Sequence, residues 1–349
     1  MRPVLLFASV IAAAQPLVFA AIGEMVVEKS GVLNLGVEGM MIVGAIAGFA
    51  AAVTTGSPLL GVAAGAAGGA WMALIFAILT QVLLANQVAT GLALTLFGLG
   101  LAALLGQGYT GQTPPSFPRV DLLYLSDAPI IGPLFFSHDL MVYAGLALVT
   151  LVASWLSFTR GGLILRAVGE DHDAAHALGY PVVAIRILAI AFGGAYLSLI
   201  RVPLWSEGMT AGIGWIALAI VVFGAWRPWR VMLGAYLFGG VTILQLNMQA
   251  ENITPLWLIA FALFLLAVQA TVNRVLLQRG SVRVLVPLWL SAFVTGLWAE
   301  TYPVQISSEY LSMAPYLATI LVLVVMSSNK LQSGLKAPSA LGQVFQAND

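Results

Sequence analysis

Two polar side chains stand close together in an apolar, glycine-rich stretch near the start of the sequence. Residues 31–45 read GVLNLGVEGMMIVGA, which places Asn34 and Glu38 four positions apart. On a helix, residues at this spacing lie on one face. A carboxylate inside a bilayer is costly unless it faces a cavity or a partner. The pair therefore predicts a polar interior beside this stretch.

The depth of Glu38 and the nearby glycines leave two interpretations open. On a straight helix, Glu38 lies about 13 Å beyond Lys29, at 1.5 Å per residue. The glycines at 31, 36 and 39 would permit a broken helix or close packing of backbones. Glu38 either lines a transport pathway or has a structural role, in which it caps a broken helix or pairs with a backbone donor.

Further amides, hydroxyls and one aromatic ring could line the same pathway. Amides and hydroxyls both donate and accept hydrogen bonds, so they suit neutral polyols and nucleobases. The indole of Trp215 would stack on a base or simply pack in the core. No intramembrane Arg or Lys is evident that would hold a carboxylate or phosphate, which disfavours amino acids and sugar phosphates. The candidate pathway residues are Asn34, Glu38, Asn86, Gln87, Thr90, Thr210 and Trp215.

Motifs for the chain's own energy supply or catalysis are missing. A P-loop needs a Gly-Lys pair, and the three lysines follow Glu28, Asn329 and Leu335. His172 and His176 share a helical spacing that could bind a metal, but zinc sites usually need three or four protein ligands. A solvated polar face explains these two histidines better. No bound cofactor and no metal site is therefore expected.

The composition is that of a membrane protein. Hydrophobic residues make up 60% of the 349 residues and charged residues 8%, against about 25% charged in soluble domains. The net charge of zero gives no reason to expect a nucleic-acid partner. Runs of about 20 apolar residues suit membrane spans. The sequence predicts an all-α, polytopic transmembrane helical bundle of about nine to eleven spans, with candidates at 3–22, 32–54, 58–84, 87–107, 138–158, 182–202, 211–224, 230–248, 254–272, 283–299 and 310–327.

The basic residues predict the orientation. With the loop 159–181 in the cytoplasm and the segments alternating, eleven of the 14 Lys and Arg residues fall inside and three outside. The amino terminus is then outside and the carboxyl terminus inside. The predicted organisation is a transmembrane domain at 1–327 and a cytoplasmic tail at 328–349. The outer residues are Arg2, Arg119 and Arg201, and the inner ones are Lys29, Arg160, Arg166, Arg186, Arg227, Arg230, Arg274, Arg279, Arg283, Lys330 and Lys336.

The inner loop has the pattern of a short exposed helix. Residues 159–181 read TRGGLILRAVGEDHDAAHALGYP, in which small residues follow an acidic cluster and Gly179 and Pro181 mark a stop. The small residues would allow close packing against another surface. A simple polar connector is the alternative.

Several motifs resemble one family. EDHDAAHALG resembles the cytoplasmic coupling loop of ABC importer permeases, whose E-A-A-x-x-x-G signature docks on an ATPase subunit, with Asp in place of Glu here. Four further stretches resemble, in order, segments of the nucleoside and simple-sugar permeases, which are relatives of the ribose and branched-chain amino-acid permeases. These stretches are EKSGVLNLGVEGMMIVGA, ANQVATGLAL, TAGIGWIALAIVVFGAWRP and APSALG. The resemblance implies ATPase coupling through Glu170, Asp173, Ala174, Ala175 and Gly179.

The resemblance also implies a function and partners. The chain would be the permease subunit of an ATP-binding cassette importer in the plasma (inner) membrane of a prokaryote, moving a nucleoside or simple sugar by alternating access. Partner ATPase subunits would use ATP and Mg. A second, related permease subunit and an extracytoplasmic substrate-binding lipoprotein would complete the complex. One departure is an insert at roughly 253–303, long enough for a helical hairpin.

Two other classes of function stay open. A secondary, proton-coupled transporter of small polar solutes would use Glu38 as its proton site. An intramembrane enzyme or a structural subunit would need a catalytic constellation at a membrane face, and none is visible in the sequence. The coupling loop favours the ABC importer.

Overall fold

The computed structural model describes residues 3–117, 132, 136–197, 205–206, 210–251 and 337–346, with several short stretches between 287 and 320. Its contacts divide the chain into two units. The first comprises Met1–Gly240 and Ala318–Asp349, and the second comprises Val241–Leu317. The fold and the site described below belong to the first unit. The insert predicted at 253–303 and most of the outer loop at 108–137 lie outside the described residues.

Every regular element in these described ranges is a helix, which confirms the all-α class. Among the described residues, six helices are long and apolar enough to cross a membrane, and α8 and α9 are shorter apolar helices. The chain is therefore a multi-pass membrane protein. In order, the helices are α1 Pro3–Lys29, α2 Val37–Thr55, α3 Pro58–Ala77 continued by a π-helical turn Ile78–Val82, α4 Gln87–Gly106 followed by a 3-10 turn Gln107–Tyr109, α5 Leu140–Phe158, α6 Arg160–Glu170, α7 His172–Ala177, α8 Val182–Leu197, α9 Ile213–Phe223 and α10 Pro228–Glu251.

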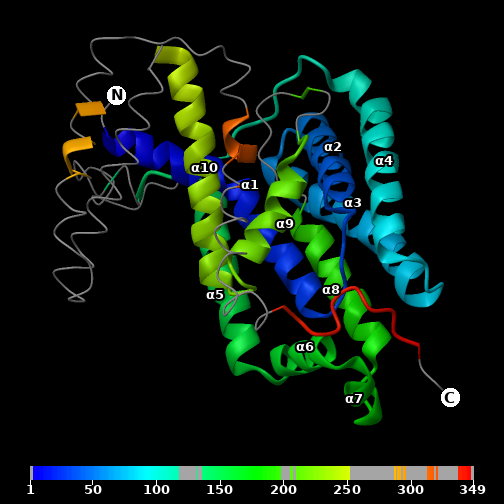
Figure 1. The fold of residues 1–349 in the computed structure, drawn as a ribbon. Coiled ribbons are helices and arrows are strands. Elements are labelled where there is room, and N and C mark those ends of the chain that lie inside the picture. Colours follow the sequence, from blue (N-terminus) through cyan, green and yellow to red (C-terminus); the bar gives the residue numbers. More distant parts are fainter. Residues whose placement is uncertain are drawn as a thin grey trace. The chain divides into compact units, whose positions relative to one another are not determined.

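Helix α1 lies at the centre of the first unit, between α5, α8 and α9 (Figure 1). Ala20, Ile22 and Met25 have no exposed surface, as expected for a helix that neighbours surround. The predicted end of this segment at residue 22 was wrong, because the helix continues to Lys29. Glu24 and Glu28, which lie beyond the predicted end, are buried inside the bundle with hydrogen-bond partners.

Helix α2 packs against α3, α4 and α8. The crossing with α4 is close because Gly39 and Gly98 face each other across it. A Cβ on Gly39 would lie 2.4 Å from the carbonyl oxygen of Leu94, and one on Gly98 would lie 2.6 Å from that of Gly39. Small residues at a helix crossing let the two backbones approach. The glycines in this part of the sequence therefore serve packing.

Residues 30–36, which we call the break segment, separate α1 from α2. Gly31 has a φ of +86°, a conformation that glycine adopts without strain. The sequence left open a broken helix or close packing of backbones, and the chain does leave helical geometry here. The prediction that the helix begins at residue 32 was wrong by five residues. The chain can leave helical geometry here because other elements satisfy the freed backbone groups, as described below.

The inner loop forms two short helices, where the sequence predicted one. Thr159 caps α6 by accepting a 3.1 Å hydrogen bond from Gly162 N–H, and Asp171 caps α7 by accepting a 2.9 Å bond from Ala174 N–H. Gly179, with a φ of +87°, donates its N–H to the His176 carbonyl and ends α7. Asp171 divides the loop because its side chain starts a new helix there.

Candidate functional site

The break segment runs back alongside α1 and is fastened to it by Asn34. This side chain is fully buried, donates through Nδ2 to Glu24 Oε2 at 3.1 Å, and accepts through Oδ1 from Gly36 N–H at 3.0 Å. The second contact forms a local turn of the kind that Asn favours. Asn34 therefore shapes the break, and its amide is already engaged on both its oxygen and its nitrogen.

Helix α4 also binds the break segment, through two hydrogen bonds. Gln87 Oε1 accepts a 2.8 Å bond from Leu33 N–H, and Thr95 Oγ1 donates a 3.1 Å bond to the Leu35 carbonyl. These bonds satisfy backbone groups that a helix would otherwise have paired. The other two candidates on this element lie elsewhere: Asn86 is exposed and caps α4 with a 3.0 Å bond from Ala89 N–H, and Thr90 is half-buried.

Glu38 joins the start of α2 to the start of α9. Its Oε1 accepts from Gly212 N–H at 3.0 Å and its Oε2 from Gly214 N–H at 2.8 Å. The first N–H groups of a helix have no partner within it, and they attract negative charge. The Glu38 carboxylate gives the start of α9 both hydrogen-bond acceptors and a negative charge. Of the two interpretations open at the sequence level, these bonds support the structural one.

Thr210 and Trp215 flank that contact on either side. Thr210 is fully buried, and its hydroxyl has no hydrogen-bond partner within the described part of the chain. Trp215 is 42% exposed on α9, so its indole is available to a neighbour outside this chain's core. Of the seven candidate pathway residues, Asn34 and Gln87 meet at the break segment, and Glu38 lies two residues beyond its end.

Three buried charged residues were missed as site residues. Glu28 accepts a hydrogen bond from the indole Nε1 of Trp226, and the Glu24 carboxylate is buried beside Asn34. Arg186 is fully buried and donates through Nε to the Ser30 carbonyl at 3.1 Å. The sequence did offer one signal, because these charged residues lie next to or inside apolar runs. An ionisable residue within a membrane segment is a candidate functional residue.

At the end of the bundle where the inner loop lies, α7 presents one face outward and one inward. Glu170, Asp173, Ala174 and Gly179 are exposed, with the Asp173 side chain 79% accessible. Ala175 is 2% exposed, so its side chain cannot form part of an outward surface as the sequence motif suggested. Its side chain is turned about 100° from that of Ala174, at 3.6 residues per turn, and packs in a small apolar cluster with Val168 and Val182.

His172 is the other inward residue of α7. Its Nδ1 lies 3.3 Å from Arg186 Nη2. Burial, and then the positive charge of Arg186, lower the pKa of His172 below its usual value. His172 and His176 both contact the ring of Phe345, with centroid separations of 5.3 and 5.2 Å. The histidine pair is therefore engaged in packing against the tail.

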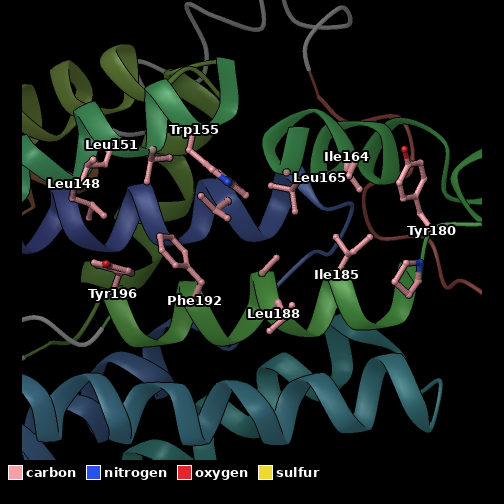
Figure 2. Close-up of a pocket in the computed structure, with 15 residues that line it drawn as sticks. Leu148, Leu151, Trp155, Ile164, Leu165, Tyr180, Ile185, Leu188, Phe192 and Tyr196 are labelled. Atoms are coloured by element: carbon pink, nitrogen blue, oxygen red, sulfur yellow. The ribbon is translucent and has the colours of Figure 1, made fainter. Parts of the chain in front are cut away.

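An apolar cavity of about 700 Å³ lies between α1, α5, α6 and α8. Figure 2 shows Leu148, Trp155 and Leu165 on one side of it and Ile185 and Phe192 on the other. None of the seven candidate pathway residues lines this cavity. Its walls offer few hydrogen-bonding groups, so a polar solute would lose its water contacts there without replacement. The cavity is thus distinct from the polar interior around the break segment.

Comparison with known proteins identifies relatives over most of the chain. The chain is 42% identical over 252 residues to the "Putative glucose ABC transporter permease protein TsgC13" of Haloferax volcanii, covering 69% of this chain and 77% of that protein. It is 34% identical over 248 residues to the guanosine ABC transporter permease protein NupQ of Bacillus subtilis, covering 65% and 77%. It is 33% identical over 248 residues to the nucleoside ABC transporter permease protein NupC of Lactococcus lactis, covering 66% and 78%.

No solved structure matches the chain. A family model does: the branched-chain amino acid transport system / permease component matches residues 6–270. This range runs from the first turn of α1 to beyond α10, and so contains both the break segment and the exposed α7. The resemblance to nucleoside and simple-sugar permeases that the motifs suggested is confirmed. The chain is a member of the branched-chain amino acid transport system / permease component family.

Proposed function

We propose that this chain is the transmembrane permease subunit of an ATP-driven importer in the plasma (inner) membrane of a prokaryote. It carries a nucleoside or a simple sugar by alternating access. Partner ATPase subunits supply the energy by hydrolysing ATP with Mg, and this chain contributes no hydrolytic site of its own. A second, related permease subunit and an extracytoplasmic substrate-binding lipoprotein complete the importer.

The exposed face of α7 is the observation that carries this proposal. A helix of six residues with a cap at each end extends from the cytoplasmic end of the bundle. Asp173, Ala174 and Ala177 are exposed and short, so a groove on a partner could receive the backbone closely at these positions. Leu178, just after the helix, is 77% exposed. This is the surface on which an ATPase subunit would press.

The chemistry of the interior supports a neutral substrate. Arg186 is the one buried Arg or Lys among the described residues, and backbone carbonyls already engage its guanidinium. The exposed indole of Trp215 remains available to stack on a base or a sugar ring. Relatives named for guanosine, nucleosides and glucose agree with that chemistry.

Docking on α7 is tested by co-purification. Ala174→Arg adds a long charged side chain to the exposed face and should reduce recovery of the ATPase subunits by about tenfold or more, a penalty typical of a mismatched charge at an interface. Deletion of residues 170–179 should abolish recovery while leaving membrane insertion intact. Gln112→Arg, an exposed position on the outer connection, is the matched control. ATPase subunits that still co-purify and couple with the deletion variant would show that α7 is not the docking site.

The substrate class is tested on the partner binding protein. A thermal-shift screen should include nucleosides, nucleobases, simple sugars and amino acids. We expect stabilisation by a nucleoside or a sugar, since ligand binding to the native state raises the unfolding temperature. Stabilisation by amino acids alone would contradict the proposed substrate.

A further inference from the structure

Residues 337–346, near the carboxyl terminus, lie against the break segment and helices α6 and α7. We call residues 337–346 the strap; it is the red segment beside α6 and α8 in Figure 1. Two backbone bonds place it: Ala340 N–H donates to the Gly169 carbonyl at 3.0 Å, and Gly342 N–H donates to the Gly31 carbonyl at 3.0 Å. The strap therefore connects the end of α6 directly to the break segment.

Side chains extend this connection to α7. Ser339 Oγ donates to Glu170 Oε2 at 3.0 Å. Phe345 is 6% exposed and packs with Val168, Ala175 and Val182 in a small apolar cluster separate from the main core. Its ring also contacts both histidines of α7. A helix of one or two turns is unstable alone, so the inward face of α7 depends on this cluster for its position.

Arg186, on α8, contacts the break segment, the strap and α7. Nε donates to the Ser30 carbonyl, Nη1 to the Gln343 carbonyl at 3.1 Å, and Nη2 contacts His172. Its positive charge lies at the carboxyl end of α1, where the helix dipole favours a cation. Gln87 completes the set, because it binds Leu33 on the break segment and donates to the Gln343 carbonyl at 3.4 Å.

We propose that the strap, together with Arg186, transmits displacement of α7 to the break segment and thereby links the ATPase-binding surface to the substrate pathway. The backbone bonds, the buried guanidinium and the aromatic cluster make one packed block from α7 to Gly31. After Gly31 the break segment continues through Asn34 into α2, where Glu38 accepts hydrogen bonds from the start of α9. A packed block with few alternative arrangements passes on a shift of one element to the next. This inference rests on the proposed function, because it requires an ATPase that acts on α7.

The test uses the complete reconstituted importer and measures substrate transported per ATP hydrolysed. Phe345→Ala removes the contact with α7 and should lower this ratio by about tenfold, within the usual range of coupling factors, while the ATPase subunits stay bound and continue to hydrolyse ATP. Phe345→Leu retains apolar bulk in the cluster and should restore most of the ratio. The control is Val344→Ala, since the neighbouring Val344 side chain is 39% exposed.

A second variant protects the test from a simple loss of folding. Arg186→Lys keeps the buried charge but can no longer donate to the Ser30 and Gln343 carbonyls in the fixed geometry of a guanidinium. It should also lower the transported amount per ATP. An unchanged ratio in both variants, or loss of ATPase binding in place of a changed ratio, would overturn the proposal. Absence of ATP-driven uptake in the unmodified importer would instead contradict the proposed function.

Discussion

Glu38, in the first turn of α2, accepts a 2.8 Å hydrogen bond from the backbone N–H of Gly214 at the start of α9, although 176 positions separate them in sequence. The starts of two helices thus meet at one carboxylate inside the bundle. In repeat-built transporters, interrupted helices of this kind surround the substrate site. Here the negative charge that favours a helix start comes from the protein itself.

Replacing Glu38 tests this role. Glu38→Gln keeps the size of the side chain but presents an NH₂ group to one of two backbone N–H donors, so one donor loses its acceptor. We expect destabilisation of about 1–3 kcal/mol, the usual cost of an unsatisfied buried polar group, measured as a lower unfolding temperature in detergent. Asp173→Asn makes the same chemical change at an exposed carboxylate and should have little effect. Equal stability of the two variants would mean that Glu38 does not cap α9.

The close crossing of α2 and α4 gives a second prediction. Gly39→Ala places a methyl group 2.4 Å from the Leu94 carbonyl oxygen, so the helices must separate. We expect a loss of about 1–3 kcal/mol in the free energy of unfolding, as for other overpacked sites. Gly100→Ala is the matched control on α4, where an added Cβ meets nothing within 4 Å. Removal of a helical glycine there should leave stability unchanged or increase it. Similar unfolding temperatures for both variants would contradict the close crossing.

The lowered pKa of His172 predicts a pH dependence. Burial lowers the pKa of His172 most, and the Arg186 charge lowers it further. Together they outweigh Asp173 and Asp171, which raise this pKa. The folded protein therefore binds the proton more weakly than the unfolded chain does. Stability should be complete above the ordinary histidine pKa of about 6.5 and should fall as the pH drops below it.

Thermal unfolding at several pH values across that range checks this prediction. His172→Asn should weaken the pH dependence, since the group that titrates is removed. His176→Asn, at the other histidine that contacts Phe345, is the control and should retain it. A wild-type protein whose stability is constant or rises as the pH decreases through about 6.5 would contradict the expected direction.

The position of the strap can be tested directly, because the chain contains no cysteine. The pair Glu170→Cys and Ser339→Cys replaces side chains that lie 3.0 Å apart, so a short thiol-specific cross-linker should join them efficiently. The pair Arg160→Cys and Ser339→Cys is the control, since Arg160 begins the same helix about 15 Å away at 1.5 Å per residue. After a protease cuts the chain between the two cysteines, only cross-linked fragments stay together on a denaturing gel. Equal cross-linking yields for the two pairs would refute the described position of the strap.

The local parts of the site were predictable from sequence. Glycines around Asn34 predicted a break, and a Gly-Pro stop predicted the end of α7, because both features depend on residues next to one another. The motifs of this region also identified the family. By contrast, α1 was predicted to end seven residues early. Isolated carboxylates at 24 and 28 resemble a membrane boundary unless their partners, Asn34 and Trp226, are known.

The long-range contacts could not be predicted from one sequence. Nothing near Glu38 indicates that its acceptors face Gly212 and Gly214, and nothing near Arg186 indicates that its guanidinium meets the Gln343 carbonyl. Each of these contacts depends on packing between distant helices. The amphipathic spacing of α7 did not reveal that Ala175 faces inward, because the apolar cluster that buries it includes Phe345 from the tail.

The central claim is that this chain moves a neutral solute at the expense of ATP hydrolysed by its partners. The most direct measurement is uptake of labelled nucleoside or sugar into proteoliposomes that contain the complete importer and receive the loaded binding protein. With ATP and Mg supplied to the ATPase subunits, we expect accumulation that a protonophore does not abolish and that the deletion of residues 170–179 eliminates. Uptake that proceeds without ATPase subunits and follows a proton gradient would contradict the claim.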